Sequence, residues 1–444
     1  MAALSEFSIE TDFYPSENGS PEERATMADV IISRGTEVLT SVDDAWAQSV
    51  RPSVRVASYP LAMWFAASWW RLLHEAGATH HREQSHSWRM AHELRGVGGG
   101  FLWPRITFSP DGERVDITSR PSRRVLAEPV RFLSDSIGSV STRAFSRELD
   151  RFIASVVARL HAPGLKNSEL EALWADVQEE RQSPENARHR ALEAALGFDA
   201  DDAPPELVTG LLQLEPIASA ETVDELANAT SSAASLRKQP WEVLKFVDGA
   251  LRGGGTPARF VPPLSGSAKV DASALPWQRG RSLAKAMRQA LGESSGAVSD
   301  ASLETLIGAK FKTAPASAPL GLALPSLGEH VRVYFRRVHP TGRRFEVARL
   351  LGAHAMAATN SSWLVGSDAA TASQKAQRAF AAEFLVPIAE LVEVLGGDLS
   401  QEALERAADH FQVSPLTISS HLANNGIIEP NDVAAVGWHL GSQF

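Results

Sequence analysis

The sequence predicts a helix-dominated α+β protein, and three observations support that fold class. Strand-like alternation is concentrated in the first 135 residues. Apolar residues spaced three and four apart, which are typical of amphipathic helices, dominate most of the chain after residue 141. The length of 444 residues is enough for about three domains, so strand-rich and helix-rich regions can fold separately.

The composition limits the kinds of function that the chain can have. With 44% hydrophobic and 22% charged residues, it resembles an average globular protein rather than a disordered or fibrous one. The 53 acidic residues exceed the 43 basic residues, which argues against nucleic-acid binding by overall charge. Because Cys is absent, disulfides, thiolate zinc sites and a Cys nucleophile are excluded, and metal ligands must come from His or carboxylates.

No segment has the pattern of a membrane span or a secretory signal. The longest near-apolar run covers 59–70 and ends at Arg71, whereas a bilayer-spanning helix needs about 20 apolar residues. The first residues are acidic and lack an apolar core. We therefore expect a cytoplasmic protein that does not insert into membranes.

Residues 1–135 are predicted to form a Trp-rich α+β domain. Strand-like runs occupy 29–33 and 53–57, and 61–75 reads as a buried helix. The alternating residues of 105–118 flank Pro-Asp-Gly, a tight-turn sequence, and predict a β-hairpin. Six of the eleven Trp residues fall in this region.

Two further regions precede the C-terminal domain. Residues 136–252 are predicted to be a helical connector, which begins near Ser141 as a helix start signal. Residues 253–275 are rich in Gly, Pro and Ser and are predicted to be the main linker.

Residues 276–444 are predicted to form a C-terminal domain of helices around a strand. Helices are expected at 279–291, 344–358 and 371–385, and a strand at 330–338 leads into a turn at 340–342. Several short helices follow.

The most specific pattern in the chain is Arg343-Arg-Phe-Glu-Val-Ala-Arg-Leu-Leu-Gly-Ala-His354, followed by Gln377-Arg-Ala-Phe-Ala-Ala-Glu-Phe-Leu-Val-Pro387. Together these segments resemble the ImmA/IrrE family of bacterial metallopeptidases. In that family a helix of the form R-F-T-L-A-H-E-L-G-H supplies two zinc-binding His and a general-base Glu, and a later helix supplies the third ligand. The resemblance extends over 276–428, including helices at its end that are similar to the helix-turn-helix of the family. It implies a zincin-like domain.

The residues that such a site needs are replaced in this chain. Under the resemblance, Arg349 and Ala353 stand at the His positions, Leu350 at the Glu position and Gln374 at the carboxylate position. Arg carries a fixed positive charge, and Leu and Ala have no donor atoms, so these side chains cannot complete a catalytic zinc site. We therefore predict no catalytic residues, no bound metal and no cofactor.

The replacements have simple structural interpretations. Arg349 is expected to pair with a nearby acid, Glu346 or Glu383. Gln374 fits a capping box with Thr371 at the start of its helix. The two helices that carry the pattern were expected to wall a binding groove, with four possible groove residues: Glu346, His354, Arg378 and Glu383.

Two alternative functions remain open at this stage. One is an active hydrolase with a non-standard metal site made of His354, Glu383 and either His410 or His339. The other makes the Trp-rich N-terminal region the functional module, which binds a small molecule or nucleic acid, with the degenerate domain as its scaffold. Separately, the His residues from His74 to His92 could form a metal-binding surface. The Trp residues of the N-terminal region were weighed as an aromatic pocket against ordinary core packing: Trp64, Trp69, Trp70, Trp88 and Trp103.

The preferred hypothesis is an inactive ImmA/IrrE-like protein that acts by binding. The resemblance implies a bacterial regulatory, stress or phage-defence setting and a protein partner, possibly a repressor-like regulator. The predicted helix at 415–424 contains no Lys or Arg, so DNA reading by the helix-turn-helix-like segment is not expected.

Overall fold

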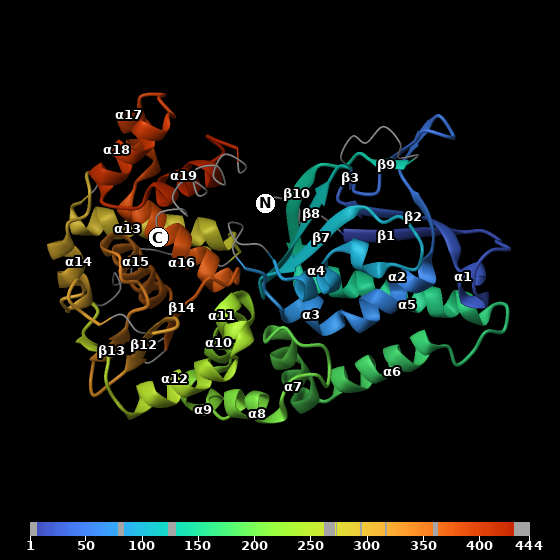
Figure 1. The fold of residues 1–444 in the computed structure, drawn as a ribbon, viewed down its shortest axis with the longest axis horizontal. Coiled ribbons are helices and arrows are strands. Elements are labelled where there is room, and N and C mark those ends of the chain that lie inside the picture. The colour runs from blue at the N-terminus through green and yellow to red at the C-terminus, as the bar shows by residue number, and fades with distance from the viewer. Residues whose placement is uncertain are drawn as a thin grey trace. The chain divides into compact units, whose positions relative to one another are not determined.

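The chain is divided into two compact units in the computed structural model (Figure 1). The structure describes residues 7–78, 84–122, 130–261, 271, 273–293, 295–315, 318–357 and 363–429. Unit 1 extends to Thr209 and unit 2 begins at Gly210, so the chain passes from one to the other within α8 (Pro205–Leu212). Helices predominate over strands, and the α+β class is confirmed.

Unit 1 combines small antiparallel sheets with helices. Its strands are β1 (Phe7–Phe13), β2 (Met27–Arg34), β3 (Glu37–Val38), β4 (Val42–Asp44), β5 (Ser49–Arg51), β6 (Val54–Ala57), β7 (Arg105–Pro110), β8 (Arg114–Arg120), β9 (Val130–Phe132) and β10 (Ser136–Ser141). Its helical elements are α1 (Pro21–Ala25), α2 (Ser58–Ala67), α3 (Trp69–His74), α4 (His86–His92), the 3-10 turn η1 (Leu94–Val97), α5 (Thr142–His161), α6 (Glu169–Gln182) and α7 (Pro184–Ala195). The sheets have the orders β1-β2-β3 with β6 also on β2, β10-β8-β7, and β5-β4-β9.

The predicted hairpin is present as β7 and β8. The Asp111 carboxylate accepts hydrogen bonds from the backbone N–H groups of Glu113 and Arg114, at 3.0 and 2.7 Å, which closes the turn. The two predicted strands lie within β2 and β6, which pair with each other. The single helix expected over 61–75 is instead two helices, because α2 ends at Ala67 and α3 starts at Trp69, with Ser68 between them.

The core of unit 1 extends beyond the predicted domain boundary at residue 135. Strand β10 pairs with β8, and helix α5 buries Phe145, Leu149 and Phe152 completely in the same core as the sheets. An amphipathic helix must bury its apolar face against another element, and here that element is the sheet before it. The region expected as a connector, 136–252, is therefore shared between the two units.

Unit 2 is a helical domain with one antiparallel sheet. Its helices are α9 (Glu215–Ala218), α10 (Ala220–Ser232), α11 (Ala234–Lys238), α12 (Trp241–Arg252), α13 (Pro276–Leu291), α14 (Asp300–Ile307), α15 (Pro340–Met356), α16 (Ala372–Leu385), α17 (Ile388–Leu395), α18 (Gln401–Phe411) and α19 (Pro415–Asn424). Its strands are β11 (Thr256–Ala258), β12 (Gly321–Pro325), β13 (Val331–Tyr334) and β14 (Leu364–Gly366), in the order β11-β13-β12-β14.

Two details of unit 2 differ from the sequence expectations. The start of the predicted linker is an edge strand, since β11 pairs with β13, while 262–270 and 272 lie outside the described residues. The turn expected at 340–342 is the first turn of α15, where Pro340 occupies a position whose N–H has no helical partner.

Close packing of three helices positions the segment that carries the family resemblance. A Cβ atom added to Gly280 of α13 would lie 2.1 Å from the carbonyl oxygen of Ala376 in α16. One added to Gly352 of α15 would lie 2.6 Å from the ring of Phe380 in α16. Glycine at these two positions lets α13 and α15 approach α16 directly, so α15 and α16 are in contact rather than separated at this level.

Candidate functional site

Two residues that the resemblance places at zinc-ligand positions, Arg349 and Gln374, meet in the structure. Arg349 of α15 and Gln374 of α16 are 25 residues apart, and the Arg349 Nη2 group donates a hydrogen bond to Gln374 Oε1. The same Nη2 donates to the carbonyl oxygen of Ser367 at 2.6 Å. Arg349 is 9% exposed and Gln374 is 0% exposed. A buried hydrogen-bonded contact thus connects the helices that would supply opposite sides of a metal site.

The amide of Gln374 is held by contacts on both of its polar atoms. Its oxygen also accepts from the Ser367 N–H at 2.9 Å, and its nitrogen donates to the Val365 carbonyl at 2.8 Å. Thr371 caps α16 by accepting from the Gln374 N–H at 3.2 Å, but the Gln374 side chain turns into the site instead of back to the cap. The predicted reciprocal capping box is therefore wrong, because the end of β14 supplies the side chain with better partners.

The structure adds a carboxylate that the sequence interpretation missed. Glu225 of α10 accepts from Thr371 Oγ1 at 2.6 Å and from Gln374 Nε2 at 2.7 Å. Removal from water raises the pKa of Glu225, against the opposing effect of these two hydrogen bonds. Glu225 lies 149 residues before Gln374 and outside the segment that carries the resemblance, so no local pattern indicated it.

Positive charge is concentrated at this site. Burial lowers the pKa of Arg349 to about 10, and burial together with the charge of Arg349 lowers that of Arg378 to about 9. Arg378 donates to the Ala369 carbonyl at 2.9 Å, and the buried Nε of Arg349 has no hydrogen-bond partner. Asp368 pairs with Arg336 at 2.6 Å. Two neighbouring guanidinium groups are therefore held mainly by neutral oxygen atoms.

The predicted acid partners of Arg349 are engaged elsewhere. The two carboxylate oxygens of Glu346 accept from the backbone N–H groups of Arg336 and Arg337, both at 3.0 Å. Glu383 faces α13 and α19, with Arg281 at 3.3 Å and His421 at 3.5 Å. The prediction that Arg349 forms an ion pair with Glu346 or Glu383 is therefore wrong.

The four expected groove residues lie in different surroundings. Burial raises the pKa of Glu383, but His421, Arg281 and Lys285 outweigh this effect and the net pKa is lowered. His354 stacks on Phe260 with ring centroids 5.0 Å apart, and burial lowers its pKa.

The other two groove candidates, Glu346 and Arg378, belong to the polar surroundings of Arg349 described above. Leu350 and Ala353, by contrast, lie in the apolar core of unit 2.

The His residues of the alternative metal site are also separated. His339 lies beside the hydroxyl of Thr341 at 2.9 Å, and His410 is 3.9 Å from Glu390. Within the part of the chain that the structure describes, no group of three or more His, Asp or Glu side chains is placed to hold a metal ion.

The five candidate Trp side chains and His92 contribute to the interior of unit 1. The exposed fractions of the five candidate Trp side chains are all below 10%: Trp64 8%, Trp69 1%, Trp70 9%, Trp88 5% and Trp103 5%. His92 is fully buried and stacks on Trp88 with centroids 4.2 Å apart. Burial lowers the pKa of His74 to about 4, and His80 and His81 lie outside the described residues.

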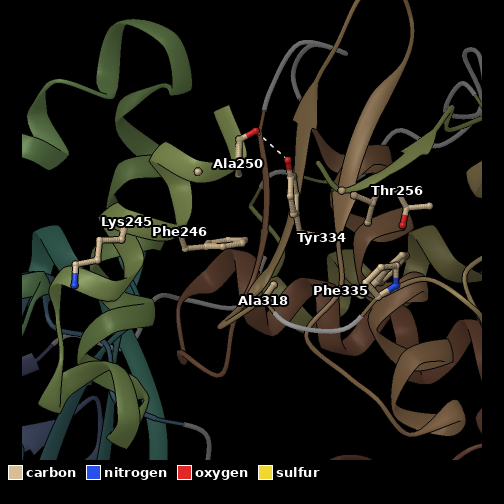
Figure 2. Close-up of a pocket in the computed structure, with 11 residues that line it drawn as sticks. Lys245, Phe246, Ala250, Thr256, Ala318, Tyr334 and Phe335 are labelled. Carbon is tan, nitrogen blue, oxygen red and sulfur yellow. Dashed lines mark hydrogen bonds between the residues drawn. The ribbon is translucent and has the colours of Figure 1, made fainter. Parts of the chain in front are cut away.

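A pocket of about 290 Å³ lies elsewhere in unit 2, between α12 and β13 (Figure 2). Figure 2 shows the ring of Phe246 directed toward Tyr334, whose hydroxyl donates to the Ala250 carbonyl at 2.9 Å. Lys245 points away from Tyr334 in this view and pairs with Glu242 at 2.9 Å. The charge of Lys245 is therefore directed away from the rings of Phe246 and Tyr334. The Arg349–Gln374 cluster is the stronger candidate site.

No protein-family model, curated protein or solved structure matches this chain. Helices that are long and apolar enough to cross a membrane are not found among the described residues.

Proposed function

We propose that this chain is a catalytically inactive relative of the ImmA/IrrE metallopeptidases and acts by binding a protein or peptide in a bacterial regulatory, stress or phage-defence system. The contact between Arg349 and Gln374 carries the proposal. The family pattern assigns these residues to one zinc site, and they meet across two helices. An Arg at a ligand position places a positive charge where a zinc ion would need a donor.

The other replaced positions of the motif also support the loss of peptidase activity. Leu350, at the general-base position, is an apolar core residue, and Ala353 offers no ligand atom. Without a metal-activated water and a base, the site has no means of attacking a peptide bond. The remaining capacity is recognition through the surface and polar groups of the domain.

Restoring the zinc-binding residues of the motif tests the proposed relationship to the ImmA/IrrE family. We expect the variant Arg349→His, Leu350→Glu, Ala353→His and Gln374→Glu to bind about one zinc per chain with tetrahedral N/O coordination. Zinc content is measured by elemental analysis and coordination by X-ray absorption. Wild type should hold no stoichiometric zinc. One tightly held zinc in wild type would favour the alternative of an active enzyme with a non-standard site.

A matched control moves the histidine pair by one residue. Leu350→His, combined with the native His354 and Gln374→Glu, has the same i, i+4 spacing but is rotated by about 100° around α15. It should bind no stoichiometric zinc. Equal zinc binding by both variants, or by neither, would contradict the proposed alignment.

Binding itself is tested by selecting a displayed random-peptide library on the full-length wild-type chain. Enrichment of a defined sequence motif is expected. Selection that returns no motif above an unrelated protein of similar charge would contradict the peptide-binding part of the proposal.

A further inference from the structure

We propose that the polar cluster contains a carboxylate-binding site, that Glu225 occupies it from within the chain, and that an acidic side chain of the partner displaces Glu225. The inference deepens the proposed function by naming the chemistry of the partner, and for the existence of a partner it rests on that function. An acidic peptide is the class of ligand that the site fits, because the group bound there now is itself a carboxylate.

The two oxygens of Glu225 are bound separately. Thr371 Oγ1 donates to Oε1 at 2.6 Å, and Gln374 Nε2 donates to Oε2 at 2.7 Å. Both donors lie in the first turn of α16, where the helix dipole favours negative charge. These two hydrogen bonds and the positive charge of Arg378 favour the ionised form of Glu225, although removal from water outweighs them and the net pKa is raised. The geometry is that of a two-point carboxylate receptor.

The receptor is organised independently of Glu225. Gln374 is held by Arg349, by the Ser367 N–H and by the Val365 carbonyl, so its amide orientation does not depend on α10. Thr371 is fixed as the helix cap. Donors that are already oriented can accept a second carboxylate without reorganisation, which favours binding.

The charge balance favours an anion after Glu225 leaves. The charge of Arg349 lowers the pKa of Arg378, and the unpartnered Nε of Arg349 lies in the same buried cluster. The carboxylate of Glu225 favours the charged form of Arg378, so its departure would leave Arg378 less well neutralised. Gln374 is fully buried, whereas Glu225 retains some exposed surface, so Glu225 is the more accessible of the two residues.

Chemical rescue tests the receptor with acetate as the probe. In full-length Glu225→Ala, sodium acetate should raise Tm saturably, by roughly 2 °C relative to sodium chloride of equal ionic strength. Wild type should show no such difference, because Glu225 fills the site. Glu225→Gln, which fills the space without charge, and Glu221→Ala, on the exposed part of the same helix, are the matched controls. A response of Glu225→Ala no larger than that of Glu221→Ala overturns the carboxylate site.

Wild type supplies a measurement that does not depend on the folding of a variant. A hexaglutamate peptide should accelerate amide hydrogen exchange in 220–232, because it competes with Glu225, whereas a hexaglutamine peptide should not. Unchanged exchange with hexaglutamate overturns displacement by an acidic partner. The zinc-restoration experiment does not involve Glu225, so failure here and failure of the proposed function are distinguishable.

Discussion

Each unit of this protein buries arginines, and one from each unit, Arg71 and Arg349, are stabilised in different ways. Arg71 in unit 1 is 4% exposed and Arg349 in unit 2 is 9% exposed. Arg71 donates to the Glu75 carboxylate at 2.7 Å and to Asp199 at 3.0 Å. Arg349 instead donates to an amide oxygen and a backbone carbonyl.

The electrostatic consequences are opposite. Burial disfavours the charge of both side chains, but Glu75 and Asp199 more than compensate in unit 1, and the net pKa of Arg71 is raised. The acids around Arg349 raise its pKa by less than burial lowers it, so the net pKa is lowered. The difference indicates that Arg71 belongs to a closed structural ion pair, whereas Arg349 belongs to a site that retains unneutralised charge.

The largest expected effect is the loss of the unit 1 pair. Arg71→Met leaves Glu75, which is 3% exposed, as a buried carboxylate without its main cation. We expect a loss of about 3–5 kcal/mol in the free energy of unfolding, because removing one member of a buried pair strands the other charge. Urea denaturation followed by Trp fluorescence measures it. A loss under about 1 kcal/mol would show that the pair is not structural.

The corresponding change in unit 2 should be milder. Arg349→Met removes a buried charge whose direct partners are neutral, and Gln374 keeps its bonds to Ser367 and Val365. We expect a loss of about 1–2 kcal/mol, chiefly from the carbonyl left without a donor. The measurement is chemical denaturation followed by far-UV circular dichroism. A loss equal to that of Arg71→Met would erase the distinction between the two sites.

The pH dependence should differ between the units. Burial and the charge of Arg71 lower the pKa of His92 from 6.5 to about 3, so the unfolded chain binds this proton more readily than the folded one. Stability from His92 is complete above pH 6.5 and declines as the pH falls toward about 3. The limiting slope is about 1.4 kcal/mol per pH unit.

The contribution of Glu225 to stability changes with pH in the opposite direction. Its pKa is raised above 4.5, so its contribution is complete below that value and declines as the pH rises through the folded pKa. Urea denaturation between acidic and neutral pH, compared with His92→Gln and Glu225→Gln, separates the two contributions. If His92→Gln keeps the full acid sensitivity of wild type, His92 is not its source.

An exposed ion pair gives the lower limit of the comparison. Arg120 and Asp135 are 2.8 Å apart, but their side chains are 45% and 60% exposed. We expect Arg120→Ala to change the free energy of unfolding by less than about 0.5 kcal/mol, since solvent screens such pairs. The same urea titration measures it, and a change above about 1 kcal/mol would mean that exposure is a poor guide to the energetics of these pairs.

The local sequence was enough to predict several elements. Pro110-Asp111-Gly112 predicted the β7–β8 turn, which the Asp111 carboxylate closes within three residues. Ser141 was predicted as a helix start, and it caps α5 through its own hydroxyl. These predictions succeeded because the interactions that decide them span only a few residues.

The sequence also brought Arg349 and Gln374 to attention as replaced motif positions, but not their partners. It predicted an ion pair for Arg349 and a capping box for Gln374, which are the nearest local options. In the structure the two side chains bind each other, Arg349 also donates to the Ser367 carbonyl, and Gln374 also donates to Glu225. Local patterns cannot rank such contacts, because they depend on which elements pack together.

By itself, then, the sequence determined the α+β class and the absence of cysteine chemistry. Those properties follow from composition, periodicity and side-chain chemistry. Only the tertiary structure decided that α5 joins the core of unit 1, and that Glu225 reaches Gln374 across 149 residues. The physical reason is that burial and charge neutralisation depend on the distances between groups in space, and packing sets those distances.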